Sequence, residues 1–324
     1  FFFQPHPGIP DAQESRGLGD VYKRQGARHY YTNMVDDFKD KVMNKFVTEY
    51  QKGRTPHPCL SCNHNLKFDS LFKKADELGA EFIATGHHAK ITHKDGQFNV
   101  EKASDTNKDQ SYVLFTLSQE KLKRLLFPVG NYSKDEIREI AKKYNLSHAE
   151  KPDSQHICFI PNGNYREFLK NKIKPNKLNI YNENGEKLKE HDGIHNFTIG
   201  QRKGIEIGGL NKKVYVKSIN SLNGDVIISD NENLFEKELV ADQINWTKGY
   251  TPTDKIRIKA KIRYNAIEQE ATLNLISKNK ISVVFDNPVR AITPGQPVVI
   301  YKGKKVLGGG IIKNSIPLKS EANV

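Results

Sequence analysis

Apolar side chains three and four residues apart predict three helices in the first half of the chain. Residues 36–50 carry the first of them. Asn63 is the expected N-cap of the second, whose apolar face continues to Leu78. The segment from Ser133 to Glu136 has the form of a capping box and opens the third.

Short apolar runs between these helices predict buried strands. Residues 29–32 form one such run, and residues 81–85 form another that ends at Gly86. Helices that alternate with short buried strands favour an α/β domain. Ligands of open α/β sheets bind beyond the carboxyl ends of the strands, so Gly86 is a candidate ligand-binding position.

After Cys158 the helical spacing gives way to strand alternation. One helix is expected, followed by three strands: residues 165–172, 195–198, 214–219 and 226–229. The last two strands flank Asn223-Gly224, a strong hairpin signal. From residue 242 onward, short alternating segments separated by turns predict a small β-barrel.

These changes in pattern divide the chain into four parts. Residues 1–25 show no periodicity and are expected to be a non-native or disordered leader outside the fold. Residues 26–161 are expected to form a partial α/β catalytic domain. A central domain over residues 162–240 and a C-terminal β-barrel over residues 241–324 complete the prediction.

The charge balance favours a polyanionic partner. Among 324 residues, Lys and Arg number 51 against 38 Asp and Glu, a formal net charge of +13. Nucleic acid is the first expectation, although many lysines could simply solvate helix faces. Hydrophobic residues make up 36% and the mean hydropathy is −0.67, and no apolar run is long enough to span a membrane. We expect no membrane partner.

The chain has three cysteines: Cys59, Cys62 and Cys158. They are too few for a disulfide-stapled secreted domain, so a cytoplasmic protein with reactive or metal-binding thiols is expected. A CxxC placed before a helix predicts a lowered thiol pKa at Cys62. Zinc is the alternative, with His57 and His64 nearby. A closed zinc site needs four ligands and no second CxxC exists, so no tightly bound metal is expected.

Cys158 lies in an apolar run, between Ile157 and Phe159. An inert buried cysteine is the common fate of such a residue. Asp153, Ser154 and His156 directly upstream are unusual before a purely structural strand, which keeps a chemical role for this thiol open.

Six blocks of the sequence carry a resemblance to a known family: TPHPCLSCNHNLKF, ATGHHAKI, KDQSYVL, PDSQHICFI, FTIGQRKGI and AITPGQPVV. In this order, from about His29 to Ile312, they resemble the bacterial tRNA-specific 2-thiouridylases. The resemblance implies an adenine nucleotide alpha hydrolase-like α/β domain, a small central domain and a C-terminal β-barrel. It also implies ATP-dependent 2-thiolation of the wobble uridine (position 34) of tRNA.

The resemblance assigns roles to particular residues. Cys158 resembles the cysteine that carries a persulfide, Cys62 the nucleophile that resolves it, and Gly86 a glycine beside the nucleotide. Similarity to tRNA-binding positions extends to His57, Pro58, Cys59, His87, Lys108, Asp109, Gln110, Arg263, Tyr264 and Gln296. The implied partners are ATP with Mg²⁺, tRNAs of the Lys, Glu and Gln types, and a sulfur-donor persulfide protein.

Residues 255–264 alternate between cations and apolar residues. In a strand this pattern places five cations on one face: Lys255, Arg257, Lys259, Lys261 and Arg263. Lysines that guard an edge strand are the structural alternative. The resemblance of Arg263-Tyr264 to a tRNA contact favours RNA.

The family's SGGxDS pyrophosphate loop does not occur in the sequence, so an N-terminally truncated enzyme with an incomplete nucleotide site is expected. Two other functions remain open. One is a zinc-stabilised RNA-binding protein without catalysis. The other is a different ATP-dependent tRNA-modifying enzyme of the same superfamily, such as a lysidine-forming ligase.

Overall fold

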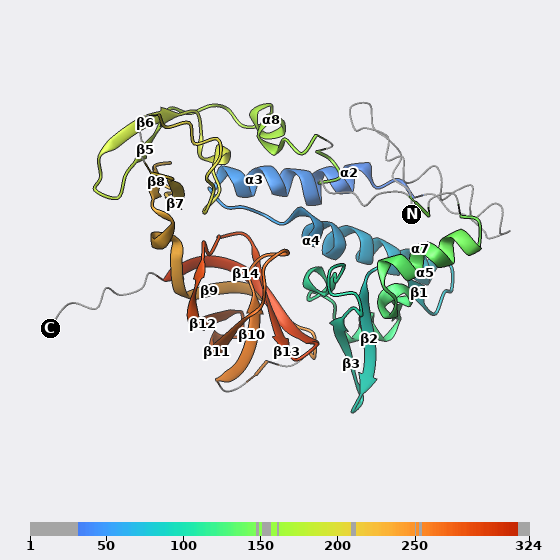
Figure 1. The fold of residues 1–324 in the computed structure, drawn as a ribbon. Coiled ribbons are helices and arrows are strands. Elements are labelled where there is room, and N and C mark those ends of the chain that lie inside the picture. Colours follow the sequence, from blue (N-terminus) through green and yellow to red (C-terminus); the bar gives the residue numbers. More distant parts are fainter. Residues whose placement is uncertain are drawn as a thin grey trace.

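The computed structural model describes residues 32–146, 149–150, 157–160, 162–208, 212–249, 251–252 and 255–316, and every structural statement below concerns these residues. Figure 1 shows a helical layer, a β-rich region from the middle of the chain at one end of this layer, and the C-terminal barrel below it. Residues 29–31 of the first expected strand and residues 1–25 lie outside the described part. No helix in that part is both long and apolar enough to cross a membrane.

The first helix runs without a break through three segments: α2 (Val35–Phe38), the π-helical η1 (Lys39–Asn44) and α3 (Lys45–Gln51). It confirms the helix expected at residues 36–50. Phe38, Val42, Phe46 and Tyr50 are all buried and lie four residues apart, so one stripe of the helix faces the core.

The second helix begins six residues earlier than expected. It runs through α4 (Pro58–Cys62), η2 (Asn63–Phe68) and α5 (Asp69–Glu77), with His57 as its N-cap. The prediction of Asn63 as N-cap is wrong, since this side chain is buried inside the helix. Proline at the first helical position explains the earlier start, because its fixed φ suits a helix and its missing N–H needs no partner there. The CxxC therefore occupies the first turn of the helix.

The remaining elements of the α/β region follow in chain order: β1 (Ile83–Ala84), β2 (Ala89–Lys94), β3 (Gln97–Lys102), η3 (Ser111–Val113), α6 (Gln119–Lys123), β4 (Leu125–Leu126), η4 (Pro128–Asn131) and α7 (Lys134–Lys143). β1 lies within the strand expected at residues 81–85 and pairs in parallel with β4. The capping box of α7 is confirmed, with the Ser133 and Glu136 side chains each bonded to the other's backbone amide. β2 and β3 form a hairpin that was not expected from the sequence.

The central region contains α8 (Tyr165–Lys170), β5 (Leu178–Tyr181), β6 (Lys187–His191), η5 (Ile194–Asn196), β7 (Tyr215–Ile219), β8 (Val226–Ser229) and η6 (Asn231–Leu234). Its four strands form a sheet in the order β6-β5-β8-β7, and the β7–β8 hairpin turns at Asn223-Gly224 as expected. The strand expected at residues 195–198 is wrong. After Gly193 the chain makes a 3₁₀ turn that buries Ile194 and His195.

The C-terminal strands are β9 (Phe235–Trp246), β10 (Ile256–Lys261), β11 (Gln269–Ser277), β12 (Lys280–Arg290), β13 (Pro297–Lys302) and β14 (Lys305–Ile316). They pair in the order β13-β10-β11-β12-β9-β14, and a further β13–β14 pairing closes the ring. The expected barrel is confirmed as a closed six-stranded one.

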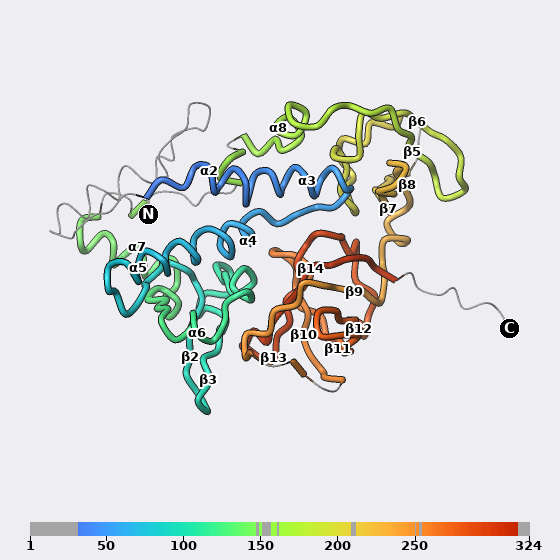
Figure 2. Tube along the Cα trace, turned by 180° about the vertical axis from the view of Figure 1, so that it is seen from behind, coloured from blue at the N-terminus to red at the C-terminus, as the bar shows by residue number. Residues whose placement is uncertain are grey.

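The α/β region and the barrel share one hydrophobic core. Tyr112 and Phe115 of the first region pack in the same cluster as Val299 and Tyr301 of the barrel. The Tyr112 hydroxyl donates to the Pro297 carbonyl over 2.7 Å. Viewed from behind, α4 runs along the top of this junction (Figure 2). The start of the second helix is therefore held between two parts of the fold.

Candidate functional site

The segment between the two long helices lies against a turn of the barrel. The Thr55 amide donates to the Pro294 carbonyl over 2.9 Å, and Gln296 Nε2 donates to the Thr55 carbonyl over 2.8 Å. Gly295 has a φ of +92°, and a Cβ there would lie 2.9 Å from the Thr55 nitrogen. A glycine is therefore required for this close approach, which fixes the path of the chain into His57.

Three rings meet just beyond this segment. The His57 ring lies 5.9 Å from that of Tyr112 and 6.3 Å from that of Tyr264, and the two tyrosine rings are 6.0 Å apart. Burial lowers the pKa of His57 to about 4, so its imidazole is neutral at pH 7. Its Nδ1 atom is buried and has no hydrogen-bond partner among the residues that the structure describes.

Cys62 and the Cys158 turn belong to one packed region. Cys62, which is 8% exposed, lies in the same hydrophobic cluster as Phe159 and Ile160. The Phe159 ring packs edge-on against those of Phe38 and Phe46 at 5.7 and 5.4 Å, which anchors the turn to the first helix. Cys158 itself is an exposed residue.

The expectation of a low pKa at Cys62 is wrong for this state of the protein. Burial raises the pKa of the Cys62 thiol to about 11, and burial also raises those of Cys59 and Cys158. The CxxC lies at the start of a helix, but loss of solvation outweighs both the helix terminus and the nearby cation of Lys67.

The three thiols are free, and beyond the effect of burial they interact electrostatically. Negative charge at Cys158 raises the pKa of Cys62, and charge at Cys59 raises the pKa of both. The cation of Lys67 lowers the pKa of all three. Residues nearly a hundred positions apart in the sequence therefore share one site.

Several predicted tRNA-binding side chains make internal hydrogen bonds. Asp109 is buried, and its carboxylate accepts from the Ala103 amide at 3.0 Å and from the Ser111 hydroxyl at 2.7 Å. Gln110 Oε1 accepts from the His88 amide at 2.9 Å. These contacts shape the loop that presents Lys108, and the assignment of this loop to tRNA stays a prediction.

His87 contacts the second helix through its ring. Its ring stacks on Phe68 at 5.6 Å, and its Nδ1 lies 2.7 Å from the Thr85 hydroxyl. Burial, together with the smaller effect of the Lys67 cation, lowers the pKa of His87 to about 4. Gly86 is exposed, and a Cβ at this position would have no atom within 4 Å, so backbone at the end of β1 is open to a ligand.

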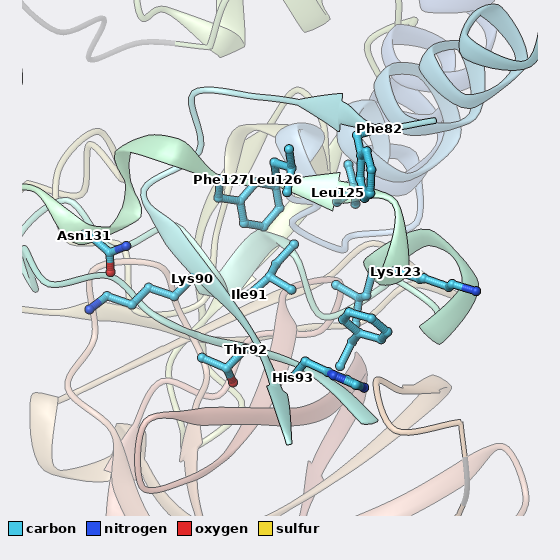
Figure 3. A pocket seen from close by; sticks show the side chains of 12 residues that line it. Phe82, Lys90, Ile91, Thr92, His93, Lys123, Leu125, Leu126, Phe127 and Asn131 are labelled. Carbon is cyan, nitrogen blue, oxygen red and sulfur yellow. The ribbon is translucent and has the colours of Figure 1, made fainter. Parts of the chain in front are cut away.

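A separate open pocket of about 360 Å³ lies between the β2–β3 hairpin and β4 (Figure 3). Phe82, Ile91 and Phe127 line it, with Lys90 and Lys123 among its polar residues. None of the predicted site residues lines this pocket. Among the residues that the structure describes, no group of three or more His, Cys, Asp or Glu side chains could hold a metal ion.

Sequence reasoning missed three residues of the site: Lys67, Tyr112 and Lys261. Tyr112 follows the KDQ triplet closely, and Lys67 lies within the block that contains the CxxC. Lys261 was one of five cations along a strand, and the alternation gave no reason to separate it from the others.

The domain order defines the class of protein. Family models match three consecutive stretches: a tRNA methyl transferase HUP domain at residues 9–162, a tRNA methyl transferase PRC-barrel domain at 166–230, and an aminomethyltransferase β-barrel domain at 236–312. The first match starts at residue 9, inside the segment expected to be a leader.

The chain belongs to the family of tRNA-specific 2-thiouridylases (MnmA). It is similar to the proteins of that name from Carboxydothermus hydrogenoformans and Halothermothrix orenii, each at 44% identity. The matches cover 91% and 90% of this chain and 82% of each relative. The corresponding protein of Clostridioides difficile is 41% identical over 91% of the chain and 83% of its own length.

Proposed function

We propose that the protein performs ATP-dependent 2-thiolation of the wobble uridine of tRNA in the cytoplasm, with Cys158 carrying sulfur as a persulfide. One observation carries the proposal: in a chain 44% identical to named 2-thiouridylases, the Cys158 turn and Cys62 share one hydrophobic cluster, and the charge of Cys158 affects the Cys62 thiol. Two thiols that can approach each other are what persulfide resolution requires.

The proposed chemistry needs an activated uridine and a sulfur donor. ATP converts the O2 of the uridine into an adenylate and releases pyrophosphate, so AMP can later leave with that oxygen. The donor protein passes its outer sulfur to Cys158. The Cys62 thiolate then attacks the inner sulfur, or the outer sulfur attacks C2 directly. In the first case a Cys62–Cys158 disulfide forms, and the freed hydrosulfide attacks C2 and displaces AMP. In the second case AMP leaves as the outer sulfur bonds to C2, and the Cys62 thiolate then attacks the inner sulfur, which breaks the S–S bond, releases 2-thiouridine and forms the same disulfide. In both cases an external thiol must reduce the disulfide.

The two thiols differ in accessibility, and this supports their separate roles. Cys158 is exposed, as an acceptor from a second protein must be, whereas Cys62 is buried beside it. At pH 7 a thiol with a pKa of about 11 is protonated, so Cys62 is inactive until its surroundings change. We infer that substrate binding provides this change, which protects the persulfide from resolution in the absence of tRNA.

The basic chain and the ring cluster support tRNA as the substrate. The formal charge of +13 favours phosphate backbones. A base under chemical attack must leave its stack, and aromatic side chains such as Tyr264 are suited to receive it. We propose tRNAs of the Lys, Glu and Gln types as substrates, and Mg²⁺ as the companion of ATP near Gly86.

A persulfide assay tests the sulfur step without nucleotide. The chain is incubated with a persulfide donor protein, and mass spectrometry of the Cys158 peptide should show the addition of one sulfur atom. Because Cys62 is protonated in the absence of tRNA, wild type and Cys62→Ser should retain this adduct equally at first, and only after tRNA is added should Cys62→Ser retain it for longer. An unmodified Cys158 alongside modified donor would contradict the proposed role.

Formation of 2-thiouridine tests the whole reaction. With tRNA, ATP and donor, we expect Cys62→Ser and Cys158→Ser each to abolish the product, while Cys59→Ser retains most of it. ATP-dependent modification of tRNA that yields no 2-thiouridine and persists in Cys158→Ser would instead support a different tRNA-modifying enzyme. Stoichiometric zinc that is lost in Cys62→Ser would support the non-catalytic RNA-binding alternative.

A further inference from the structure

The five cations of residues 255–263 do not form one uniform basic face. Arg257 makes a two-pronged ion pair with Asp286, at 2.7 and 2.6 Å, and Lys259 lies 3.2 Å from a Glu270 oxygen. Arg263 donates to the Ala291 carbonyl at 2.6 Å and to the Thr293 hydroxyl at 2.8 Å. These three are already engaged by neighbouring strands and turns.

Lys261 differs from them in its partners. Its ammonium lies 5.7 Å from the centre of the Tyr112 ring and 5.8 Å from that of Tyr264. Lys261 is half-buried, and within the described part of the chain its ammonium makes no ion pair or hydrogen bond. Two aromatic rings therefore fix the position of an ammonium group whose N–H donors are available to a ligand.

The acids nearest to Lys261 are already satisfied. Against the effect of burial, which lowers the pKa of Lys261, the charges of Asp109 and Glu268 both raise it. Asp109, however, already accepts three hydrogen bonds from Ala103 and Ser111. Glu268 accepts from Lys102 at 2.6 Å. An anionic ligand would not have to displace either carboxylate from Lys261.

The position of Lys261 relates it to the proposed target base. Both rings that hold it also contact His57, which starts the segment assigned to that base and has a buried Nδ1 without a partner. In a nucleotide, the phosphate lies next to the base that it carries. We propose that the Lys261 ammonium binds a backbone phosphate of the tRNA at the target nucleotide and so positions the base over Tyr264. This inference rests on the proposed function.

The test measures tRNA binding by fluorescence anisotropy across a series of salt concentrations. A lost phosphate contact reduces the slope of log K against log salt by about 1. We expect Lys261→Gln to show this change and to bind about tenfold more weakly at low salt, the effect of one charge-assisted contact. Lys261→Arg should restore the slope.

Lys259→Gln is the matched control, because it lies two residues away on the same strand and removes the same charge. Its partner Glu270 already neutralises it, so its slope should stay close to that of the wild type. Thermal unfolding of each variant confirms that the fold is retained.

The outcomes separate the two hypotheses. Wild-type protein that does not bind tRNA would contradict the proposed function itself. Wild-type binding with equal slopes for Lys261→Gln and Lys259→Gln would overturn only the inference about Lys261. A Lys261→Gln variant that loses affinity for ATP alone would assign the cation to the nucleotide and overturn it as well.

Discussion

At the scale of single residues, the relation of Lys67 to the thiols depends on an unusual helical register. Residues 63–68 form a π-helix, in which each turn takes up more residues than in an α-helix. Side chains five positions apart, such as those of Cys62 and Lys67, therefore project from more nearly the same side of the helix than they would in an α-helix. Lys67 is the cation that lowers the pKa of all three thiols.

Replacing Lys67 should make the thiols less reactive. In Lys67→Gln the loss of the cation raises the pKa of Cys62 above its already elevated value, so at a given pH the thiolate fraction falls. Alkylation rates followed by mass spectrometry at each cysteine should therefore shift to higher pH. Lys74→Gln, on α5, is the control and should leave the profiles unchanged. An unaltered Cys62 profile in Lys67→Gln would contradict an electrostatic role for this lysine.

The sequence indicated which cysteines matter but not their acidity. The CxxC spacing and the polar residues before Cys158 drew attention to the right thiols. Cys62 is buried in a cluster with Phe159, which is distant in sequence, and with Leu66, which lies one helical turn further on. This burial sets the pKa of Cys62. Burial of this kind depends on tertiary contacts, so a local dipole argument gave the wrong direction.

At the scale of elements, local sequence signals predicted the structure correctly where only one interpretation of the signal was possible. The capping box at Ser133 and the Asn223-Gly224 hairpin are both present. At the second helix two start signals competed, and Pro58 prevailed over Asn63. The Asp95-Gly96 turn, where φ is positive at both residues, was an available signal for the unpredicted β2–β3 hairpin.

Arg263 is expected to stabilise the loop that follows β12. Its guanidinium holds the Ala291 carbonyl, at a residue whose φ of +55° needs support. Arg263→Ala should lower the free energy of unfolding by about 1.5–3 kcal/mol, the range for hydrogen bonds to a charged group. Urea unfolding measures the change.

Arg257→Ala is the control for this prediction, since its ion pair with Asp286 is largely exposed and should contribute little. If Arg263→Ala unfolds like the wild type but loses tRNA affinity, then Arg263 is a direct tRNA contact and its structural role is minor.

At the scale of the whole molecule, the site is formed where separate parts of the fold meet. Cys62 lies in one hydrophobic cluster with side chains of the first helix and of the Cys158 turn, and the ring cluster joins His57 at the start of the second helix to Tyr264, which follows β10 of the barrel. The order of sequence blocks predicted these parts and their succession. Their contact could not be predicted, because it depends on how the Tyr112 loop packs under the closed barrel.

Gln296 tests whether the barrel positions the segment proposed to meet the base. Its amide holds the carbonyls of Thr55 and Pro56, so we expect Gln296→Ala to free this segment and weaken tRNA binding indirectly. Hydrogen exchange at the Thr55 amide, which is bonded to Pro294, should become faster in the variant.

Gln119→Ala provides a matched comparison, because Gln119 also bonds two carbonyls, those of Phe98 and Thr247, away from the site. Both variants should lose about 1–2 kcal/mol of stability, as expected when buried acceptors lose their donor. Only Gln296→Ala should alter Thr55 exchange and tRNA affinity. Weaker tRNA binding with unchanged Thr55 exchange would mean that Gln296 contacts the RNA directly, and the barrel would then be part of the binding surface and not only a support for His57.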